Sequence, residues 1–254
     1  MIIEFVGPSG AGKTFIARQL KSYLQGNLEK ARYIYLGDNE LDSHYNSSWE
    51  RLFVTQKYRF QLFLDKNFLS LLFIRMKAKG KKLFSLKYIL RMFVWYCRTA
   101  DILTNCKGNS PVFIMDEGFL ARCGHMFKNR LNEVLSDYQE LMGKINGIKR
   151  IAYAEHRKIY VLVKCEDYDE IINRVLARGK TSLYLRLDGD GRVFHEQELK
   201  SFELARDYLD RIKADYVVID NNAKQRYYTA QFNKVRELIE KRSNCDLSNE
   251  RAIL

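Results

Sequence analysis

The chain has 254 residues, of which 46% are hydrophobic, enough to bury a sizeable core in one large domain. Its five cysteines are scattered without CxxC spacing, which argues against a zinc knuckle or a disulfide framework and fits free thiols in a reducing compartment. The formal net charge of +12 favours anionic partners, such as nucleotides, phosphorylated metabolites, nucleic acid or an anionic membrane surface.

The first predicted element is a buried strand over residues 2–6, a short apolar run that ends in a glycine. A helix is predicted to follow over residues 13–24, where apolar residues recur at the helical period. The first residues lack the pattern of a secretory signal, and the most apolar stretch, 60–76, is interrupted by charges. We therefore expect a cytoplasmic protein with no transmembrane segment.

The loop between this strand and helix has the sequence GPSGAGKT, which matches the phosphate-binding (Walker A) motif GxxxxGK[ST] at every fixed position. Its backbone N–H groups and the start of the helix are expected to bind the phosphates of ATP. Lys13 is expected to contact the β- and γ-phosphates as a catalytic cation, and Thr14 to bind Mg²⁺. The expected nucleotide-binding residues of the loop are Gly7, Ser9, Gly10, Ala11, Gly12, Lys13 and Thr14.

A second strand is predicted over residues 32–36 and is followed by the polar residues Gly37, Asp38, Asn39 and Glu40. Residues 49–103 lack strand alternation and turn signals, so they are predicted to form several helices, broken near Gly80. The basic and aromatic residues of this region are typical of solvated amphipathic helices, although they also suit an anionic ligand.

A third strand is predicted over residues 111–115, and it stops at Asp116 and Glu117. An acidic residue at the end of a strand next to the first one commonly serves the magnesium shell. Successive side chains point to opposite sides of a strand, so one of the two is expected to face the nucleotide. Asp116 is favoured as the metal residue, with Glu117 as its competitor and a helix N-cap as the alternative role.

The fourth strand is predicted over residues 159–163, with a helix over 168–178 that carries Arg174 and Arg178 one turn apart. Two such guanidiniums can stabilise the charge that develops on a transferring phosphoryl group, or they can form a solvated face. The fifth strand is predicted over 216–219 and a final helix near 223–241.

Strands that alternate with helices indicate right-handed crossovers and a parallel sheet. The expected fold is a three-layer α/β domain of the P-loop NTPase type, with a five-stranded parallel sheet and helices on both faces. Residues 1–254 are expected to form a single domain, and ligands are expected at the carboxyl ends of the strands.

The sequence resembles the P-loop kinases of the thymidylate kinase and deoxynucleoside kinase group. The resemblance is carried by GPSGAGKT, FIMDEG, IYVLVKCEDYDEIINRVLARGK and YVVIDNN, in that order. It implies a helical acceptor-binding insertion at 49–107 and a lid at 174–195 that closes over ATP, with roles for Arg174, Arg178 and either Lys180 or Arg186. It also implies that the loop at 220–223, including Asn221, touches the adenine.

The chain departs from that group at one motif. Thymidylate kinases have Asp-Arg and deoxynucleoside kinases Glu-Arg after the third strand, whereas this chain has Asp116-Glu117-Gly118 and its next arginine at Arg122. The arginine that would hold the acceptor is therefore missing from its usual place, and the acceptor is left open.

Two kinds of acceptor chemistry are compatible with the sequence. A hydroxyl acceptor would use a carboxylate as its base, for which Asp38, or else Glu40, is the candidate, although turn chemistry explains these residues equally well. A phosphate acceptor would instead use arginines, for which the candidates are Arg59, Arg75, Arg91 and Arg98.

The leading hypothesis is an ATP- and Mg²⁺-dependent phosphotransferase that acts on a small hydroxyl- or phosphate-bearing metabolite, such as a nucleoside, a nucleotide or a sugar-like compound. Its partners would be a nucleoside triphosphate and a small anionic acceptor. The alternatives are a nucleic-acid-directed enzyme, such as a polynucleotide 5′-hydroxyl kinase, and an ATPase switch without an acceptor. The oligomeric state is open, and a homodimer is one of the alternatives.

Overall fold

The computed structural model of the chain describes residues 1–27, 33–35, 47–76, 84–105, 112–116, 120, 142–145, 147–148, 158–177, 191–222 and 227–251. The strands are β1 (Ile2–Val6), β2 (Tyr33–Tyr35), β3 (Val112–Met115), β4 (Lys158–Lys164) and β5 (Tyr216–Asp220). The helices are α1 (Lys13–Asn27), α2 (Ser48–Phe63), α3 (Lys66–Met76), α4 (Phe84–Asn105), α8 (Tyr168–Ala177), α9 (Gly191–Arg211) and α10 (Thr229–Arg251).

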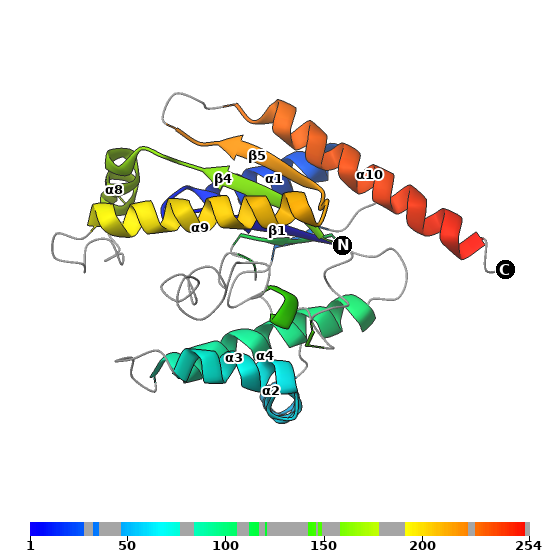
Figure 1. The fold of residues 1–254 in the computed structure, drawn as a ribbon. Helices are drawn as coiled ribbons and strands as arrows, with labels where there is room; N and C mark the ends of the chain where they lie inside the picture. Colours follow the sequence, from blue (N-terminus) through cyan, green and yellow to red (C-terminus); the bar gives the residue numbers. More distant parts are fainter. Residues whose placement is uncertain are drawn as a thin grey trace.

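The strands form one parallel sheet in the order β2-β3-β1-β4-β5, which has five strands with β1 in the middle. Ile3 of β1 pairs with Ile114 of β3 on one side and with Ile159 of β4 on the other. The predicted parallel α/β sheet is confirmed (Figure 1). Because the strands run in the same direction, their carboxyl ends share one edge, and the loop after β1 lies between β3 and β4 at this edge.

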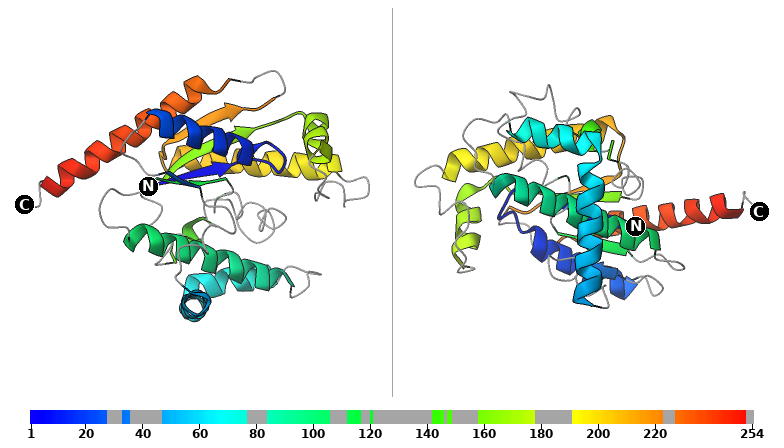
Figure 2. Two further views of the ribbon diagram at one scale, coloured as in Figure 1. Left: turned by 180° about the vertical axis from the view of Figure 1, so that it is seen from behind. Right: turned by 90° about the horizontal axis from the view of Figure 1, so that it is seen from below.

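Each face of the sheet is covered by its own helices, because successive side chains of a strand point to opposite faces. Ile3 and Phe5 belong to a core cluster with residues of α1, α8 and α10 and with Phe194 at the start of α9. Ile2 and Val6 belong to a second cluster, with residues of α2, α3, α4 and α9. Helix α9 lies in front of the sheet in Figure 1, whereas α1 and α10 lie in front when the molecule is seen from behind (Figure 2). The expectation of helices on both faces is confirmed.

The segment between β2 and β3 contains the helices α2, α3 and α4, as predicted (Figure 2). Ser47 caps the start of α2 by accepting a hydrogen bond from the N–H of Glu50. The chain then breaks at Asp65, whose carboxylate accepts from the N–H groups of Asn67 and Phe68 at the start of α3. The sequence analysis does not predict this break, and the one that it does predict, near Gly80, lies outside the described residues.

Helix α9 is the element that the sequence analysis misses. Its buried residues Phe194, Glu198, Phe202, Ala205 and Leu209 recur at helical spacing, so the period is present. The glutamate within the buried stripe weakens the apolar pattern, and the first residues of this helix, 191–195, fall within the region assigned to a lid.

The bounds of the last helix also differ from those predicted. Helix α10 begins at Thr229 rather than near residue 223, and it continues to Arg251 because no glycine or proline follows residue 241. Strand β2 is described over Tyr33–Tyr35, within the predicted range 32–36, whose two end residues lie outside the described part of the chain.

Candidate functional site

The glycine-rich loop joins the end of β1 to the start of α1 and adopts a conformation that needs its glycines. Gly10 and Gly12 have φ angles of +82° and +90°, which side-chain-bearing residues rarely adopt. A Cβ atom on Gly12 would lie 2.4 Å from Nδ2 of Asn221, and one on Gly10 would lie 2.6 Å from Cγ2 of Ile171. The loop is therefore closely packed from beneath by residues that follow β4 and β5.

Lys13 is the first residue of α1, and its ammonium group bends back over the loop. Its Nζ donates to the carbonyl oxygens of Gly7 and Pro8, both at 2.8 Å, and the residue is only 7% exposed. The helix N-terminus and this ammonium group concentrate positive charge at the loop. An anion that binds at the loop would therefore be attracted by both the helix N-terminus and the ammonium group.

Thr14, in the first turn of α1, lies beside Asp116 at the end of the neighbouring strand β3. The hydroxyl of Thr14 donates to Oδ2 of Asp116 at 2.7 Å, and Asp116 directly follows β3. The pair presents a hydroxyl and a carboxylate oxygen side by side at the edge of the sheet, and these are the ligands that Mg²⁺ prefers. Among the residues that the structure describes, no group of three or more His, Cys, Asp or Glu side chains could hold a metal ion.

Asn221 follows β5, and its polar groups bind other parts of the protein. Its Nδ2 donates to the carbonyl of Ala11 in the loop at 2.6 Å, and its Oδ1 accepts from the hydroxyl of Tyr228. Its own carbonyl accepts from Nη2 of Arg174 at 2.9 Å. Asn221 is 7% exposed, and its hydrogen bond to Ala11 holds the loop in place. The adenine contact expected from the sequence stays a prediction.

Arg174 lies on α8 beside the same part of the loop. Its Nε donates to Oε1 of Glu170 one turn away at 2.8 Å, and its Nη1 lies 3.8 Å from where a Cβ of Gly12 would be. The guanidinium group also contacts Sγ of Cys165 at 3.7 Å. Burial raises the pKa of the Cys165 thiol, and the positive charge of Arg174 offsets part of that rise, so the thiol is neutral at neutral pH.

Tyr228 completes this network from the start of α10. Burial raises the pKa of its hydroxyl, and the nearby positive charge of Arg174 lowers it by less. The hydroxyl therefore stays protonated at neutral pH and donates to Asn221. The underside of the loop is thus held by hydrogen-bonded groups of α8, of α10 and of the turn after β5.

Glu198 reaches the loop from the opposite layer, and it is one of the site residues that the sequence analysis misses. Its Oε2 accepts a hydrogen bond from the N–H of Ser9 at 3.1 Å, across 189 residues of sequence, and the side chain is only 2% exposed. A glutamate within the buried stripe of a helix is the signal that could have identified it, because such residues are rarely buried without a partner.

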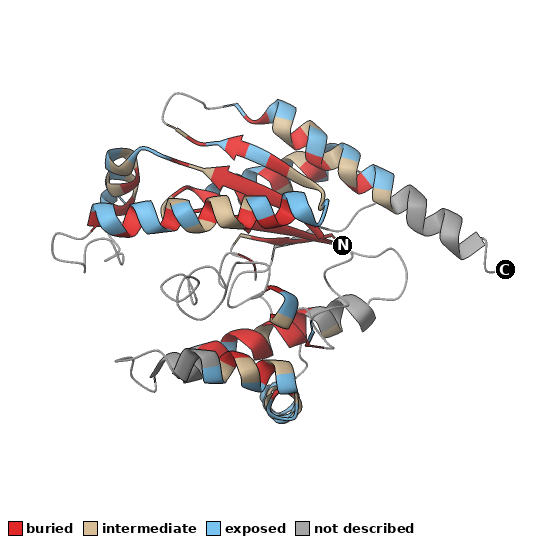
Figure 3. Ribbon diagram, viewed as in Figure 1, coloured by how far each residue is buried: buried red, intermediate tan, exposed pale blue. Residues whose placement is uncertain are grey.

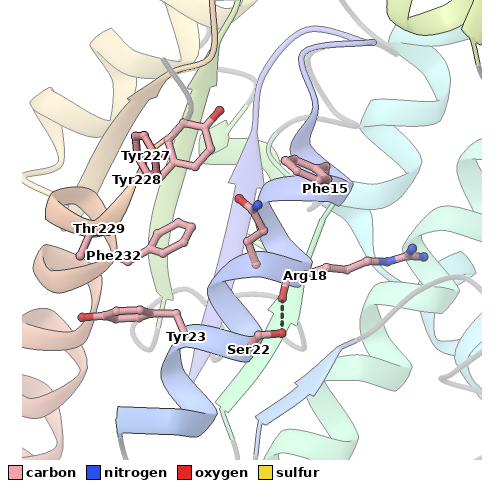
Figure 4. Close-up of a pocket in the computed structure, with 9 residues that line it drawn as sticks. Phe15, Arg18, Ser22, Tyr23, Tyr227, Tyr228, Thr229 and Phe232 are labelled. Atoms are coloured by element: carbon pink, nitrogen blue, oxygen red, sulfur yellow. Dashed lines mark hydrogen bonds between the residues drawn. The ribbon is translucent and has the colours of Figure 1, made fainter. Parts of the chain in front are cut away.

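A groove with a volume of about 520 Å³ lies between α1 and the start of α10. Figure 4 shows Phe15 on one side of it and Tyr227 and Tyr228 on the other, with Phe232 and Tyr23 farther along. Phe15 directly follows Thr14 and is 55% exposed, and Tyr227 is 85% exposed. An aromatic-lined groove therefore begins one residue beyond the phosphate loop.

The remaining sequence-predicted site residues lie outside the described part of the chain. These are Asp38 with its alternative Glu40, Glu117, Arg178, and the two lid alternatives Lys180 and Arg186. The lid expected at 174–195 is described only at its two ends, in α8 and α9. Of the arginines considered for a phosphate acceptor, Arg98 is buried, Arg59 is half-buried and Arg91 is exposed, and the side chain of Arg75 is not among those described.

The parallel sheet and the glycine-rich loop after its central strand define a protein of the α/β class whose loop carries the Walker A sequence pattern. No protein-family model and no curated protein sequence matches the chain. Among solved structures, the chain is similar to a shikimate kinase from Acinetobacter baumannii in complex with shikimate, with 16% sequence identity and a TM-score of 0.40. The match covers 95% of this chain and 93% of that one. A likeness at this level carries no argument about function, which must come from the geometry of the chain itself.

Proposed function

We propose that the chain is an ATP- and Mg²⁺-dependent phosphotransferase of a small hydroxyl- or phosphate-bearing metabolite, such as a nucleoside, a nucleotide or a sugar-like compound. The observation that carries the proposal is the arrangement around the loop: Lys13 lies over it, the Thr14–Asp116 pair stands at its end and Glu198 touches its beginning. Phosphoryl transfer requires mainly positioning and charge stabilisation, and this arrangement supplies both.

Thr14 and Asp116 would hold Mg²⁺ together with the phosphates of ATP. Their oxygens suit this metal, which usually keeps several waters and takes only one or two carboxylates from the protein. The ion would neutralise part of the phosphate charge. Glu117 stays the alternative metal residue. Lys13 would contact the β- and γ-phosphates, and backbone N–H groups of the loop, such as those of Gly10, Gly12 and Thr14, would bind the remaining phosphate oxygens.

Arg174 is proposed to stabilise the transferring phosphoryl group, with Arg178 as its neighbour in a lid over residues 174–195. The closeness of Arg174 to Gly12 supports this role, although its bonds to Glu170 and Asn221 also fit a purely structural one. The single domain, with an acceptor-binding insertion at 49–107, remains part of the same proposal.

We propose that the groove between α1 and α10 receives the nucleotide base. Because the groove begins at Phe15, one residue beyond the phosphate loop, a nucleotide whose phosphates occupy the loop would extend its base toward Phe15 and Tyr227, whose rings can stack on it. Tyr227→Ala is expected to raise the KM for ATP about 5- to 150-fold, because one base–aromatic stacking contact is worth about 1–3 kcal/mol. The kcat at saturating ATP should stay unchanged, because the contact is the same in the ground and transition states.

Steady-state kinetics with varied ATP measure both constants. Val218→Ala is the matched control, since Val218 is an exposed apolar residue of β5 that does not line the groove. A KM that stays unchanged in both Tyr227→Ala and Phe15→Ala would place the base elsewhere.

Glu198 is proposed to orient a hydroxyl acceptor and to accept its proton, in competition with Asp38 for this role. Helix α9 shares its core cluster with α2, α3 and α4, so Glu198 approaches the loop from the layer proposed to bind the acceptor. The acceptor oxygen would attack the γ-phosphorus as the bond to the β–γ bridging oxygen breaks, ADP would leave, and the hydroxyl proton would pass to the carboxylate.

Glu198→Gln separates this role from a structural one. The amide oxygen can still accept from the N–H of Ser9, but it cannot take a proton, so kcat is expected to fall about 10²- to 10⁴-fold with little change in stability. Glu203→Gln on the same helix, where Glu203 pairs with Arg206 at the surface, should keep full activity. A Glu198→Gln enzyme with normal kcat would reduce Glu198 to a support of the loop.

The acceptor is sought by incubating the protein with metabolite pools, ATP and Mg²⁺ and detecting products that gain the mass of one phosphate. The proposal expects at least one such product, which the Lys13→Ala variant should not form. ATP hydrolysis that no metabolite stimulates would instead support a switch without an acceptor.

A further inference from the structure

Helix α2 carries a stripe of large apolar side chains that face solvent. They recur at helical spacing, so they share one side of the helix and continue into the residue that follows it. Each is between 47% and 79% exposed. The residues of this α2 stripe are Trp49, Leu52, Phe53, Phe60, Phe63 and Leu64.

The stripe does not pack into the protein core, because the core contacts the opposite side of α2. Tyr58 and Leu62 are buried in the cluster that joins α2 to α3, α4 and the sheet. Helix α2 is therefore apolar on two sides, of which one is covered. In Figure 3 the end-on view of α2, at the bottom of the molecule, is largely the colour of exposed residues. Large exposed apolar patches on soluble domains usually mark a surface that binds something.

The charges beside the α2 stripe are mainly basic. At about 100° per residue, Lys57 and Arg59 fall on its two borders, and the exposed Lys66 lies just beyond the end of the helix. Glu50 is the only acidic residue in α2. The carboxylate of Asp65 is occupied as the cap of α3, where it accepts from two backbone N–H groups.

We propose that the α2 stripe docks onto the surface of an anionic lipid bilayer, with α2 lying in the plane of the interface. A helix with Trp, Phe and Leu on one side and basic residues beside them is suited to this position. The net charge of +12 adds attraction to anionic headgroups. No helix among the described residues is long and apolar enough to span a bilayer, and the docking proposed is peripheral and reversible.

Charge favours a lipid surface over a second copy of the chain as the occupant. Lys57 and Arg59 lie near the middle of α2, so antiparallel pairing of two such helices would bring the basic borders of both copies together. An anionic headgroup layer neutralises these charges instead. The α2 stripe lies within the proposed acceptor-binding insertion, but none of its residues contacts the phosphate loop in the described contacts. Vesicle binding therefore tests the docking separately from catalysis.

The test is flotation of the full-length protein with vesicles of phosphatidylcholine alone and of phosphatidylcholine and phosphatidylglycerol in equal parts. The protein should float with the anionic vesicles and much less with the neutral ones. Phe53→Ser combined with Phe60→Ser should weaken the partition at least about tenfold, since each ring loses its burial in the interface. Lys57→Gln and Lys66→Gln should each weaken it roughly fivefold. Ile212→Ser, at an exposed apolar residue beyond α9, is the control and should bind normally.

The fluorescence of Trp49 reports the orientation. The chain has two tryptophans, so Trp95→Phe leaves Trp49 as the sole reporter, and its emission should shift to the blue when anionic vesicles are added. The proposal is overturned if the protein does not float, if the Phe53/Phe60 variant floats like the unaltered chain, or if Trp49 emission does not move. It is also overturned if the protein is a dimer in solution that the Phe53/Phe60 variant converts to a monomer, because a second copy would then cover the stripe.

Discussion

Lys13→Ala is expected to lower the turnover number at least ~10²-fold, the scale of removing one preorganised electrostatic stabiliser. The ammonium group of Lys13 lies over the loop and is nearly buried. The other residues of the first turn of α1 carry no positive charge, so none of them can replace it. The measurement is ADP formation in the presence of the acceptor that the metabolite screen identifies, under single-turnover as well as steady-state conditions.

Lys21→Ala on the same helix is the matched control, because Lys21 lies two turns away from the loop and should leave turnover unchanged. Thermal unfolding must accompany the kinetics, since Lys13 also donates to the carbonyls of Gly7 and Pro8 and supports the loop. A folded Lys13→Ala protein with near-normal turnover would refute the phosphotransferase proposal.

Glu4→Leu is expected to destabilise the protein by about 3–5 kcal/mol, because it removes a close counter-charge from a buried ammonium group. Oε2 of Glu4 on β1 lies 3.1 Å from Nζ of Lys158 on β4, and the two side chains are 0% and 1% exposed. The ammonium group also lies 4.7 Å from the centre of the Tyr96 ring on α4. Glu4 also accepts a hydrogen bond from the N–H of Leu120, so the substitution removes the acceptor of this buried donor as well.

The double variant Glu4→Leu/Lys158→Met should recover most of this loss or exceed the original stability, since hydrophobic pairs often replace buried ion pairs without cost. Urea unfolding of the two single variants and the double variant forms a complete cycle. If the double variant is as unstable as the sum of the two single ones, the two side chains do not act as a pair.

The central unit of the fold could be predicted from sequence because its signals are local. Strand β1 has the predicted bounds Ile2–Val6, and α1 begins at the predicted Lys13. Both follow from a continuous apolar run and from a motif whose glycines dictate the backbone between them. Strand β4 and helix α8 lie within one residue of their predicted bounds for the same reason.

The surroundings of the loop could be predicted less well, because they depend on contacts between distant parts of the chain. The spacing of Asp116 after β3 indicates that it lies near the loop, but only the sheet order brings it to Thr14. Glu198 contacts Ser9 through the packing of α9 against the sheet; the helical spacing indicates which face of α9 is buried, but not which group this glutamate meets. The role of Asn221 as a support beneath Ala11 likewise depends on the turn after β5 meeting the loop.

The loop is attached to both helical layers of the protein. Beneath it, Asn221 binds the carbonyl of Ala11, and Asn221 is itself held by α8 and α10; from the other layer, Glu198 of α9 binds the N–H of Ser9. A shift of the loop by a fraction of an ångström must therefore strain bonds to both layers at once. The loop therefore connects the two helical layers, and a displacement that strains its bonds to one layer is expected to strain its bonds to the other as well.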